Sequence, residues 1–157
     1  MKKPPTSDPR KRKGLIIVHT GDGKGKSTAS FGLALRAAGN KMNVFIMQFM
    51  KGPWKAGERK ALNELTNYIE YEAMGDGFTW DTKNPEEDQK TARAAFNIAK
   101  EKLMSRKYQM VILDEINYVL DYKFFPLDEF LETLRNKPKD VHVVCTGRNA
   151  QEKLIEL

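Results

Sequence analysis

The chain has 157 residues, an apolar content of 40% and a formal net charge of +6 at pH 7. This length corresponds to one domain with a sizeable core, and the apolar fraction is ordinary for a globular protein. No apolar run approaches the roughly 18 residues that cross a bilayer, and no secretory signal opens the chain, so we expect a cytoplasmic protein without a membrane partner. The single cysteine, Cys145, cannot form an internal disulfide and is expected to be reduced and buried.

The basic charge is concentrated at the N-terminus. Residues 1–13 carry a net charge of +5, which leaves +1 for residues 14–157. We expect residues 1–13 to form a disordered basic tail and residues 14–157 to form a single domain. Such a tail can bind nucleic acid or an anionic ligand, but a solvated tail is more common. Because the remaining chain is close to neutral, nucleic acid is not an expected partner.

The first predicted elements are a buried strand at residues 15–18, a glycine-rich turn and a helix. This order is typical of the phosphate-binding P-loop, in which backbone N–H groups and a helix N-terminus face the anion. Lys26 is expected to neutralise phosphate charge, and Ser27 to bind Mg²⁺. The expected phosphate-binding residues are Gly21, Asp22, Gly23, Lys24, Gly25, Lys26, Ser27 and Thr28.

The spacing of the glycines departs from the usual P-loop pattern. That pattern places a glycine five residues before Gly25, where this chain has Thr20, and the glycine follows one position later, at Gly21. A glycine-rich β-turn without phosphate is the alternative, but the agreement of strand, loop and helix favours nucleotide binding. The shifted glycine predicts an altered cradle that holds the triphosphate differently.

The helix after the loop is predicted over residues 29–38, and Gly39-Asn40 is a C-cap signal. Arg36 lies about two and a half turns past Ser27. It either reaches back toward a nucleotide or lies on a solvated face, and the sequence alone favours the solvated face. A second buried strand at 43–49, a short helix at 58–65 and a weak strand at 68–71 follow.

A loop at residues 75–84 carries two large aromatic residues, Phe78 and Trp80. From the local context, we expect both to fold back into the core. A helix start follows at 84–87, with an Asn cap, Pro at the first position and acids in the first turn. Apolar residues at helical spacing from Ala92 to Leu103 predict a core-facing stripe.

The second chemical signal is an apolar strand at residues 110–113 followed by Asp114 and Glu115. In P-loop enzymes, a carboxylate at this position holds the Mg²⁺ shell, so both acids are candidate metal residues. A helix at 126–135 and a strand at 141–145 come next. Arg148 follows that strand and is expected to face the same crevice as the P-loop.

Strands alternate with helices throughout, and a final helix is predicted from residue 150. This alternation predicts a three-layer α/β fold with a mostly parallel sheet. His19 and His142 have no metal-ligand partners at useful spacing, so we interpret both as structural.

The motifs together resemble those of the ATP:corrinoid adenosyltransferases, over nearly the whole chain from residue 14. The resemblance is carried by GDGKGKST (21–28), the segment at 44–59 that contains MQFMKGPWKAGER, GDGFTWDT (75–82), LDEINY (113–118) and TGRNA (146–150). It implies a P-loop NTPase-like, recombinase-like fold and a homodimer. It also implies transfer of the 5′-deoxyadenosyl group of ATP to Co(I) of a corrinoid, with release of triphosphate.

The resemblance also implies roles for individual residues. Residues 21–28 would bind the triphosphate in reversed orientation, in keeping with the shifted glycine. Arg36, Glu115 and Arg148 would contact the nucleotide or its metal. Phe78 and Trp80 would face the corrinoid, where large apolar side chains can exclude the axial ligand that opposes reduction to Co(I).

The implied cofactors are Mg²⁺ or Mn²⁺, with ATP and a cobalamin- or cobinamide-type corrinoid as substrates and a flavoprotein as electron donor. No general base is required when Co(I) attacks C5′, because the enzyme has only to align C5′ and stabilise the departing triphosphate. The main alternative is a P-loop phosphotransferase or ATPase that releases ADP. A nucleotide-binding module that uses the basic tail to hold nucleic acid is a third hypothesis.

Overall fold

The computed structural model describes residues 13–49, 57–65, 67–73 and 85–157. Five strands form one sheet in the order β1-β5-β4-β2-β3, and all four pairings are parallel. The strands are β1 (Ile16–His19), β2 (Val44–Gln48), β3 (Ile69–Ala73), β4 (Met110–Asp114) and β5 (His142–Thr146). The predicted α/β fold with a mostly parallel sheet is therefore confirmed.

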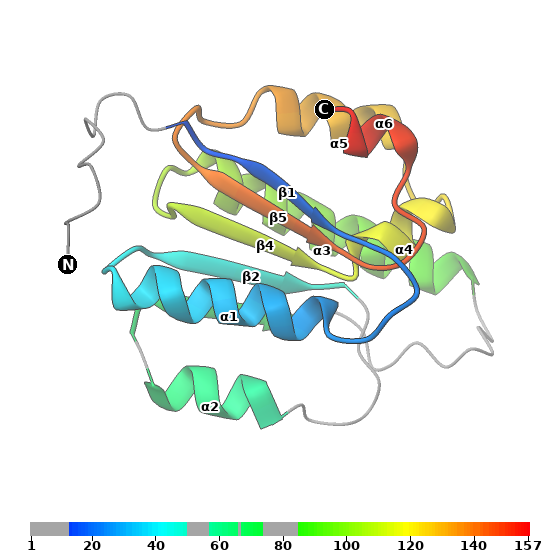
Figure 1. Ribbon diagram of the computed structural model, residues 1–157. Helices are drawn as coiled ribbons and strands as arrows, with labels where there is room; N and C mark the ends of the chain where they lie inside the picture. The colour runs from blue at the N-terminus through cyan, green and yellow to red at the C-terminus, as the bar shows by residue number, and fades with distance from the viewer. Residues whose placement is uncertain (1–12, 50–56, 66, 74–84) are drawn as a thin grey trace.

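Helices cover both faces of the sheet (Figure 1). The helices are α1 (Lys26–Gly39), α2 (Gly57–Leu65), α3 (Pro85–Met104), α4 (Ile116–Asp121), α5 (Leu127–Arg135) and α6 (Glu152–Ile155). In Figure 1, α1 and α2 lie below the sheet and α5 and α6 lie above it. Each layer has its own cluster of buried apolar side chains, one with α1 and α2 and the other with α3 to α6.

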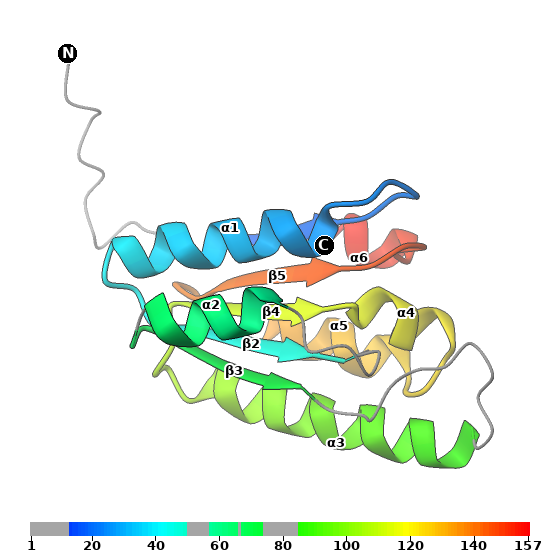
Figure 2. The ribbon, with the colours of Figure 1, turned by 90° about the horizontal axis from the view of Figure 1, so that it is seen from below.

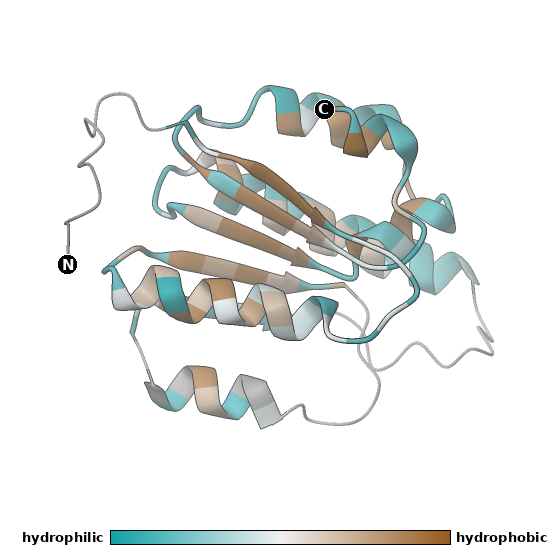
Figure 3. Cartoon of the chain, viewed as in Figure 1, coloured by the Kyte–Doolittle hydropathy of each residue, from teal (hydrophilic) through white to brown (hydrophobic). Residues whose placement is uncertain are grey.

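Alternation along each strand decides which residues enter which cluster. In β2, Val44 and Ile46 pack with α1, whereas Phe45 and Met47 pack with α3 and α5. Successive side chains of a strand point to opposite faces, so a strand covered on both faces must be apolar throughout. Figure 3 shows the central strands as largely apolar between helices of mixed hydropathy.

Most elements lie within one or two residues of their predicted positions. The predicted helix start at Pro85 is confirmed, and three acids occupy the first turn of α3. At the end of α1, the Asn40 side chain donates to the carbonyl of Arg36, as a C-cap residue does. Helix α4 was not predicted from the sequence, because its six residues are too few to show a helical repeat.

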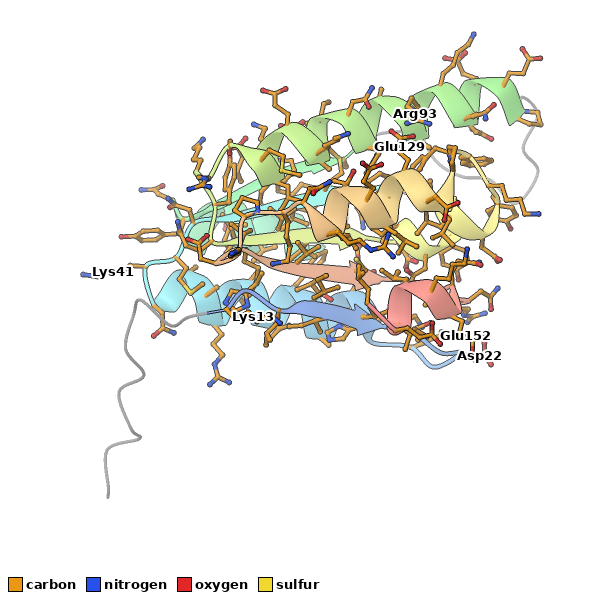
Figure 4. The ribbon with its side chains drawn as sticks, turned by 90° about the horizontal axis from the view of Figure 1, so that it is seen from above. Lys13, Asp22, Lys41, Arg93, Glu129 and Glu152 are labelled. Carbon is orange, nitrogen blue, oxygen red and sulfur yellow. The ribbon has the colours of Figure 1, made fainter. Side chains whose placement is uncertain are left out.

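Two ion-paired contacts join the elements away from the site. Between α3 and α5, both carboxylate oxygens of Glu129 accept from Arg93 Nη1 at 2.7 Å (Figure 4), and Arg93 also lies over the Phe125 ring. On β3, Glu70 pairs with Lys102 at 2.5 Å and Lys107 at 3.0 Å, and Lys102 is the main cause that lowers its pKa to about 2. The first holds α3 to α5, and the second holds α3 to β3.

The predictions for individual residues of the core also hold. Cys145 is fully buried in β5, and burial raises the pKa of its thiol to about 12. His142 Nδ1 accepts from the backbone N–H of Leu15, and His19 Nδ1 pairs with Ser30 Oγ at 2.9 Å, as expected for structural histidines. Among the described residues, no helix is both long and apolar enough to cross a membrane.

Because all strands are parallel, their carboxyl ends lie at one edge of the sheet, which we call the carboxyl edge. The turn between β1 and α1, the start of α4 and the segment from β5 to α6 all gather there (Figures 1 and 2). In Figure 4, Lys13 and Asp22 mark the two opposite ends of β1, with Asp22 on the carboxyl edge. Ligands of open α/β sheets bind outside this edge, so it positions the candidate site.

Candidate nucleotide-binding site

The P-loop begins where β1 ends. Gly21 and Gly25 have φ angles of 104° and 99°, in the region that favours glycine, and an added Cβ would meet no atom within 4 Å at either position. The glycine at position 21 is therefore required by the backbone conformation of this loop. Thr20, at the usual glycine position, accepts from the backbone N–H of Ala150 through Oγ1 at 3.2 Å.

Lys26 folds over this loop. Its Nζ donates to the carbonyl of Gly21 at 2.7 Å and also to the carbonyl of Gly23. Gly25 is the N-cap of α1 and has no side chain to bond the first N–H groups of the helix, and the first turn of α1 holds no acid. The helix N-terminus thus presents N–H donors without a side-chain cap to an anion, and Lys26 adds a positive charge beside them.

Glu115 lies across from the P-loop, at the end of β4. Its backbone is left-handed, with φ 63° and ψ 21°, and it is the N-cap of α4. Its Oε2 is buried and has no hydrogen-bond partner among the described residues. Burial, and then the neighbouring Asp114 carboxylate, raise the pKa of Glu115 to about 7, whereas Lys26 and Arg148 act in the opposite direction. The influence of Asp114, Lys26 and Arg148 on Glu115 indicates that all four charges lie near one another at this edge.

Asp114 is fully buried beside Glu115, and its carboxylate is already engaged. Oδ2 accepts from Gln48 Nε2 at 2.9 Å, and Oδ1 accepts from Thr146 Oγ1 at 2.8 Å. Of the two acids expected at the metal, Glu115 therefore has the open oxygen, whereas both oxygens of Asp114 are held by protein donors.

The turn after β5 closes the site from the side. Gly147 has φ 127°, and an added Cβ would lie 2.9 Å from Asn117 Cβ and 3.3 Å from Glu115 Oε2. Asn117 Nδ2 donates to the carbonyl of Gly147 at 2.9 Å, while its Oδ1 is buried without a partner in the described part of the chain. Two open acceptors, Glu115 Oε2 and Asn117 Oδ1, thus lie on residues that pack against the same glycine.

The donor set fits Mg²⁺, a hard cation that prefers oxygen ligands. The structure offers the open carboxylate oxygen of Glu115 and the hydroxyl of Ser27 in the first turn of α1. Over the described ranges, no group of three or more His, Cys, Asp or Glu side chains gathers to hold a metal ion. Mg²⁺ is usually bound through one or two carboxylates together with substrate phosphates, so a site of this kind is incomplete without the nucleotide.

The other predicted site residues divide into those at the site and those elsewhere. Arg148 and Asp22 are exposed and near Tyr118, whose pKa is raised first by burial and then by Glu115. Lys24 and Thr28 are exposed on the P-loop and at the start of α1.

Arg36 is exposed in the last turn of α1, about 15 Å from Lys26 by helical rise, and thus at the opposite end of this helix. Phe78 and Trp80 lie outside the described residues.

Four residues that the fold brings to the site were not predicted from the sequence, namely Tyr71, Gln48, Thr146 and Asn117. Gln48 and Thr146 each end an apolar strand, as Asp114 does, and this position was the available signal. Tyr71 lies within β3, and nothing in its local sequence indicates a role. Asn117 is two residues past Glu115, in the helix that was not predicted.

Taken together, the fold and the site define a P-loop nucleotide-binding α/β protein. Residues 12–157 match the family model for ATP:corrinoid adenosyltransferase BtuR/CobO/CobP. The chain therefore belongs to the ATP:corrinoid adenosyltransferase family, and the resemblance inferred from the motifs is confirmed.

Curated relatives agree with this assignment. The corrinoid adenosyltransferase of Escherichia coli K12 is 42% identical over 145 residues, which cover 92% of this chain and 73% of that protein. The corrinoid adenosyltransferase CobA of Salmonella typhimurium is 40% identical, over 94% of this chain and 74% of that protein. The corrinoid adenosyltransferase of Pseudomonas aeruginosa is 39% identical, over 94% and 72%. Among solved structures, domain III of the Thermotoga maritima replication initiation protein DnaA matches with a TM-score of 0.44 at 15% identity, over 94% of this chain and 52% of that chain.

Proposed function

We propose that this chain transfers the 5′-deoxyadenosyl group of ATP to Co(I) of a corrinoid and releases triphosphate. An electron pair of Co(I) forms the bond to C5′, and the C5′–O bond breaks with its pair remaining on the triphosphate. Membership in the adenosyltransferase family supports this function. The observation that carries it in the structure is the juxtaposition of Lys26, the uncapped start of α1 and the open oxygen of Glu115 at the carboxyl edge.

The chain's own groups have one main task in this reaction, which is to stabilise the leaving triphosphate. Lys26 now bonds the carbonyls of Gly21 and Gly23, and a phosphate oxygen would be a stronger acceptor for the same ammonium group. The N–H groups of residues 21–28 and the start of α1 add fixed partial positive charge. Since these donors are already in place, little reorganisation is needed as negative charge develops.

A divalent cation fits the same site. Glu115 and Ser27 are the residues that would hold it, together with phosphate oxygens. When bound, Mg²⁺ or Mn²⁺ would neutralise phosphate charge. Asp114, also expected at the cation, keeps both oxygens on Gln48 and Thr146.

The identity of the product tests the proposed function. Purified protein, MgATP and chemically reduced cobalamin should give an adenosylated corrinoid and one equivalent of triphosphate. Phosphate-detecting chromatography of the products distinguishes this reaction from that of a P-loop phosphotransferase or ATPase. Release of ADP without triphosphate would establish the alternative.

The two aromatic residues of the loop predicted at 75–84 are part of the proposal. We expect Phe78 and Trp80 to exclude the axial ligand of the corrinoid and so to favour formation of Co(I). Phe78→His and Trp80→His should leave ATP affinity nearly unchanged and slow adenosylation from Co(II), and much activity should return with pre-formed Co(I). Equal losses in both assays would remove the role in reduction, and unfolding of the variants would indicate that these aromatics pack in the core.

The same proposal includes a homodimer, a flavoprotein electron donor and a cytoplasmic location. These rest on the family resemblance and on the reduced, buried state expected for Cys145. Sedimentation equilibrium of the purified chain tests the dimer directly.

A further inference from the structure

A row of hydrogen-bonded side chains runs along the carboxyl edge across four adjacent strands. Tyr71 Oη donates to Gln48 Oε1 at 2.5 Å, and Gln48 Nε2 donates to Asp114 Oδ2 at 2.9 Å. Thr146 Oγ1 donates to Asp114 Oδ1 at 2.8 Å and accepts from the backbone N–H of Glu115, also at 2.8 Å. The row follows the order of the strands, from β3 through β2 and β4 to β5, and then returns to the residue after β4.

The donor and acceptor atoms of each side chain determine in which direction the hydrogen bonds of the row run. Because Thr146 Oγ1 accepts from the N–H of Glu115, its own proton is free to go to Asp114. The two ends of the Gln48 amide are likewise distinguished, since its oxygen faces a hydroxyl donor and its nitrogen faces a carboxylate. Asp114 and Thr146 are fully buried, so their bonds are not exchanged with bulk water.

The row ends at Glu115, whose backbone has an unfavourable conformation. Glu115 is not a glycine, yet it adopts a left-handed conformation with φ 63°. Such a conformation is unfavourable for a residue with a Cβ, because the Cβ lies too close to the following carbonyl oxygen. The bond from its N–H to Thr146 helps to hold this conformation, in which Oε2 lies buried beside Gly147 with no partner among the described residues and Lys26 acts on the carboxylate.

We propose that Tyr71, Gln48, Asp114 and Thr146 are positioning residues that hold Glu115 in the geometry that binds the divalent cation of the nucleotide. Asp114 acts through Thr146 and Glu115, not by touching the cation itself. This inference rests on the proposed function, because it requires that a metal–ATP complex is the ligand. Outer hydrogen-bond partners of metal ligands typically change metal affinity 10- to 100-fold when they are lost.

The experiment measures cation-linked ATP binding rather than turnover. A fluorescent ATP analogue is titrated in EDTA and at a series of MgCl₂ concentrations, which gives the Mg²⁺ concentration for half-maximal enhancement of affinity. Thr146→Val removes both bonds of the hydroxyl and should raise this concentration about 10-fold or more. The affinity in EDTA should stay within about 2-fold, because Lys26 and the loop N–H groups do not depend on the row.

Two further variants separate positioning from general packing. Thr146→Ser keeps the hydroxyl and should restore Mg²⁺ dependence to within about 3-fold of the parent. Thr133→Val is the matched control, because Thr133 is also a buried threonine, whose Oγ1 bonds the carbonyl of Glu129 in α5, away from the site. It should leave the Mg²⁺ dependence unchanged.

If Thr146→Val does not fold, Tyr71→Phe decides the question, since it removes a single hydroxyl at the far end of the row. It should raise the half-maximal Mg²⁺ concentration about 2- to 5-fold. If Thr146→Val folds and shows the same Mg²⁺ dependence as Thr133→Val, the inference is overturned. If Thr146→Val does not fold, a Tyr71→Phe protein with the half-maximal Mg²⁺ concentration of the parent overturns it. If the parent binds MgATP but forms no adenosylated corrinoid, the proposed function fails, while these binding measurements still test the row.

Discussion

Lys26 is the residue on which nucleotide binding depends most directly. Its Nζ bonds two loop carbonyls, and these bonds keep the ammonium at the place where phosphate is expected. Charge-assisted hydrogen bonds contribute about 1.5–3 kcal/mol, so Lys26→Ala should weaken ATP binding between about 10- and 100-fold. Isothermal titration of ATP with and without MgCl₂ measures this. Lys24→Ala, which removes an exposed cation of the same loop, is the control, and equal losses in the two variants would show that only net charge matters.

Because the pKa of Glu115 is raised, we expect this residue to make the folded protein less stable as the pH rises. Its pKa of about 7 in the folded protein lies above the ordinary 4.5, so folding favours the protonated form. The stabilisation is full below pH 4.5 and is lost as the pH rises through 7. The loss is roughly 2 kcal/mol, because solvent at the partly open site screens the interaction.

Urea unfolding of the nucleotide-free protein between pH 4.5 and 8 tests this dependence. Glu115→Gln should lack the loss, so its stability relative to the parent rises across this interval. The comparison with the variant is needed because burial lowers the pKa of His142, which acts in the opposite direction at similar pH. Glu132→Gln, at an exposed position of α5, is the control. A constant difference between Glu115→Gln and the parent at every pH would contradict the prediction.

At the scale of elements, we expect residues 1–13 to contribute little to the stability of the fold, in contrast to Gly14. Deleting residues 1–13 removes charge but little apolar area, so the melting temperature should change by less than about 2 °C. Gly14 itself is buried, its N–H donates to the carbonyl of Lys139 at 2.7 Å, and an added Cβ would lie 2.1 Å from the carbonyl oxygen of Val141. Gly14→Ala should therefore destabilise the protein by about 1–3 kcal/mol. Thermal melts of both variants check the contrast, and a large drop for the deletion would show that the tail is packed.

The positions of elements were predictable from the sequence because each long element carries its own pattern. The strand at 110–114 is apolar up to Asp114, and α3 combines a capping signal with a regular apolar stripe. The short helix α4 was missed because six residues give no repeat, and its start at Glu115 depends on a left-handed backbone that propensity does not predict.

The parts of the site that were predicted are those encoded in one continuous segment. The P-loop and the acids after β4 were found because strand, loop and charged residue are adjacent in sequence. The row from Tyr71 to Thr146 was not found, since it depends on β2 lying between β3 and β4 in the sheet. Chain order alone does not determine this strand order. Arg36 is the opposite case. Its role at the nucleotide was expected from the family resemblance, but the helix carries it to the end of α1 that lies away from Lys26.

At the scale of the whole molecule, MgATP should stabilise the fold more than ATP alone. A ligand at 100 times its dissociation constant adds about 2.7 kcal/mol to the free energy of unfolding. For a domain of this size, that corresponds to a rise of about 5–10 °C in the melting temperature. Differential scanning calorimetry with MgATP, with ATP and EDTA, and with neither measures the effect. Equal shifts with and without Mg²⁺ would contradict a cation site.

Labelling of Cys145 can measure how often the protein unfolds around β5. Cys145 is the only cysteine of the chain, it lies fully buried in β5 within the larger apolar cluster, and burial raises the pKa of its thiol to about 12. A thiol reagent can therefore label the protein only in the fraction of molecules that have unfolded around this strand. When reclosing is fast, the labelling rate is proportional to that fraction. A saturating ligand that adds about 2.7 kcal/mol should then slow labelling about 100-fold, so a single colorimetric assay on the unmodified chain would rank nucleotides and cations by how tightly the native fold holds them.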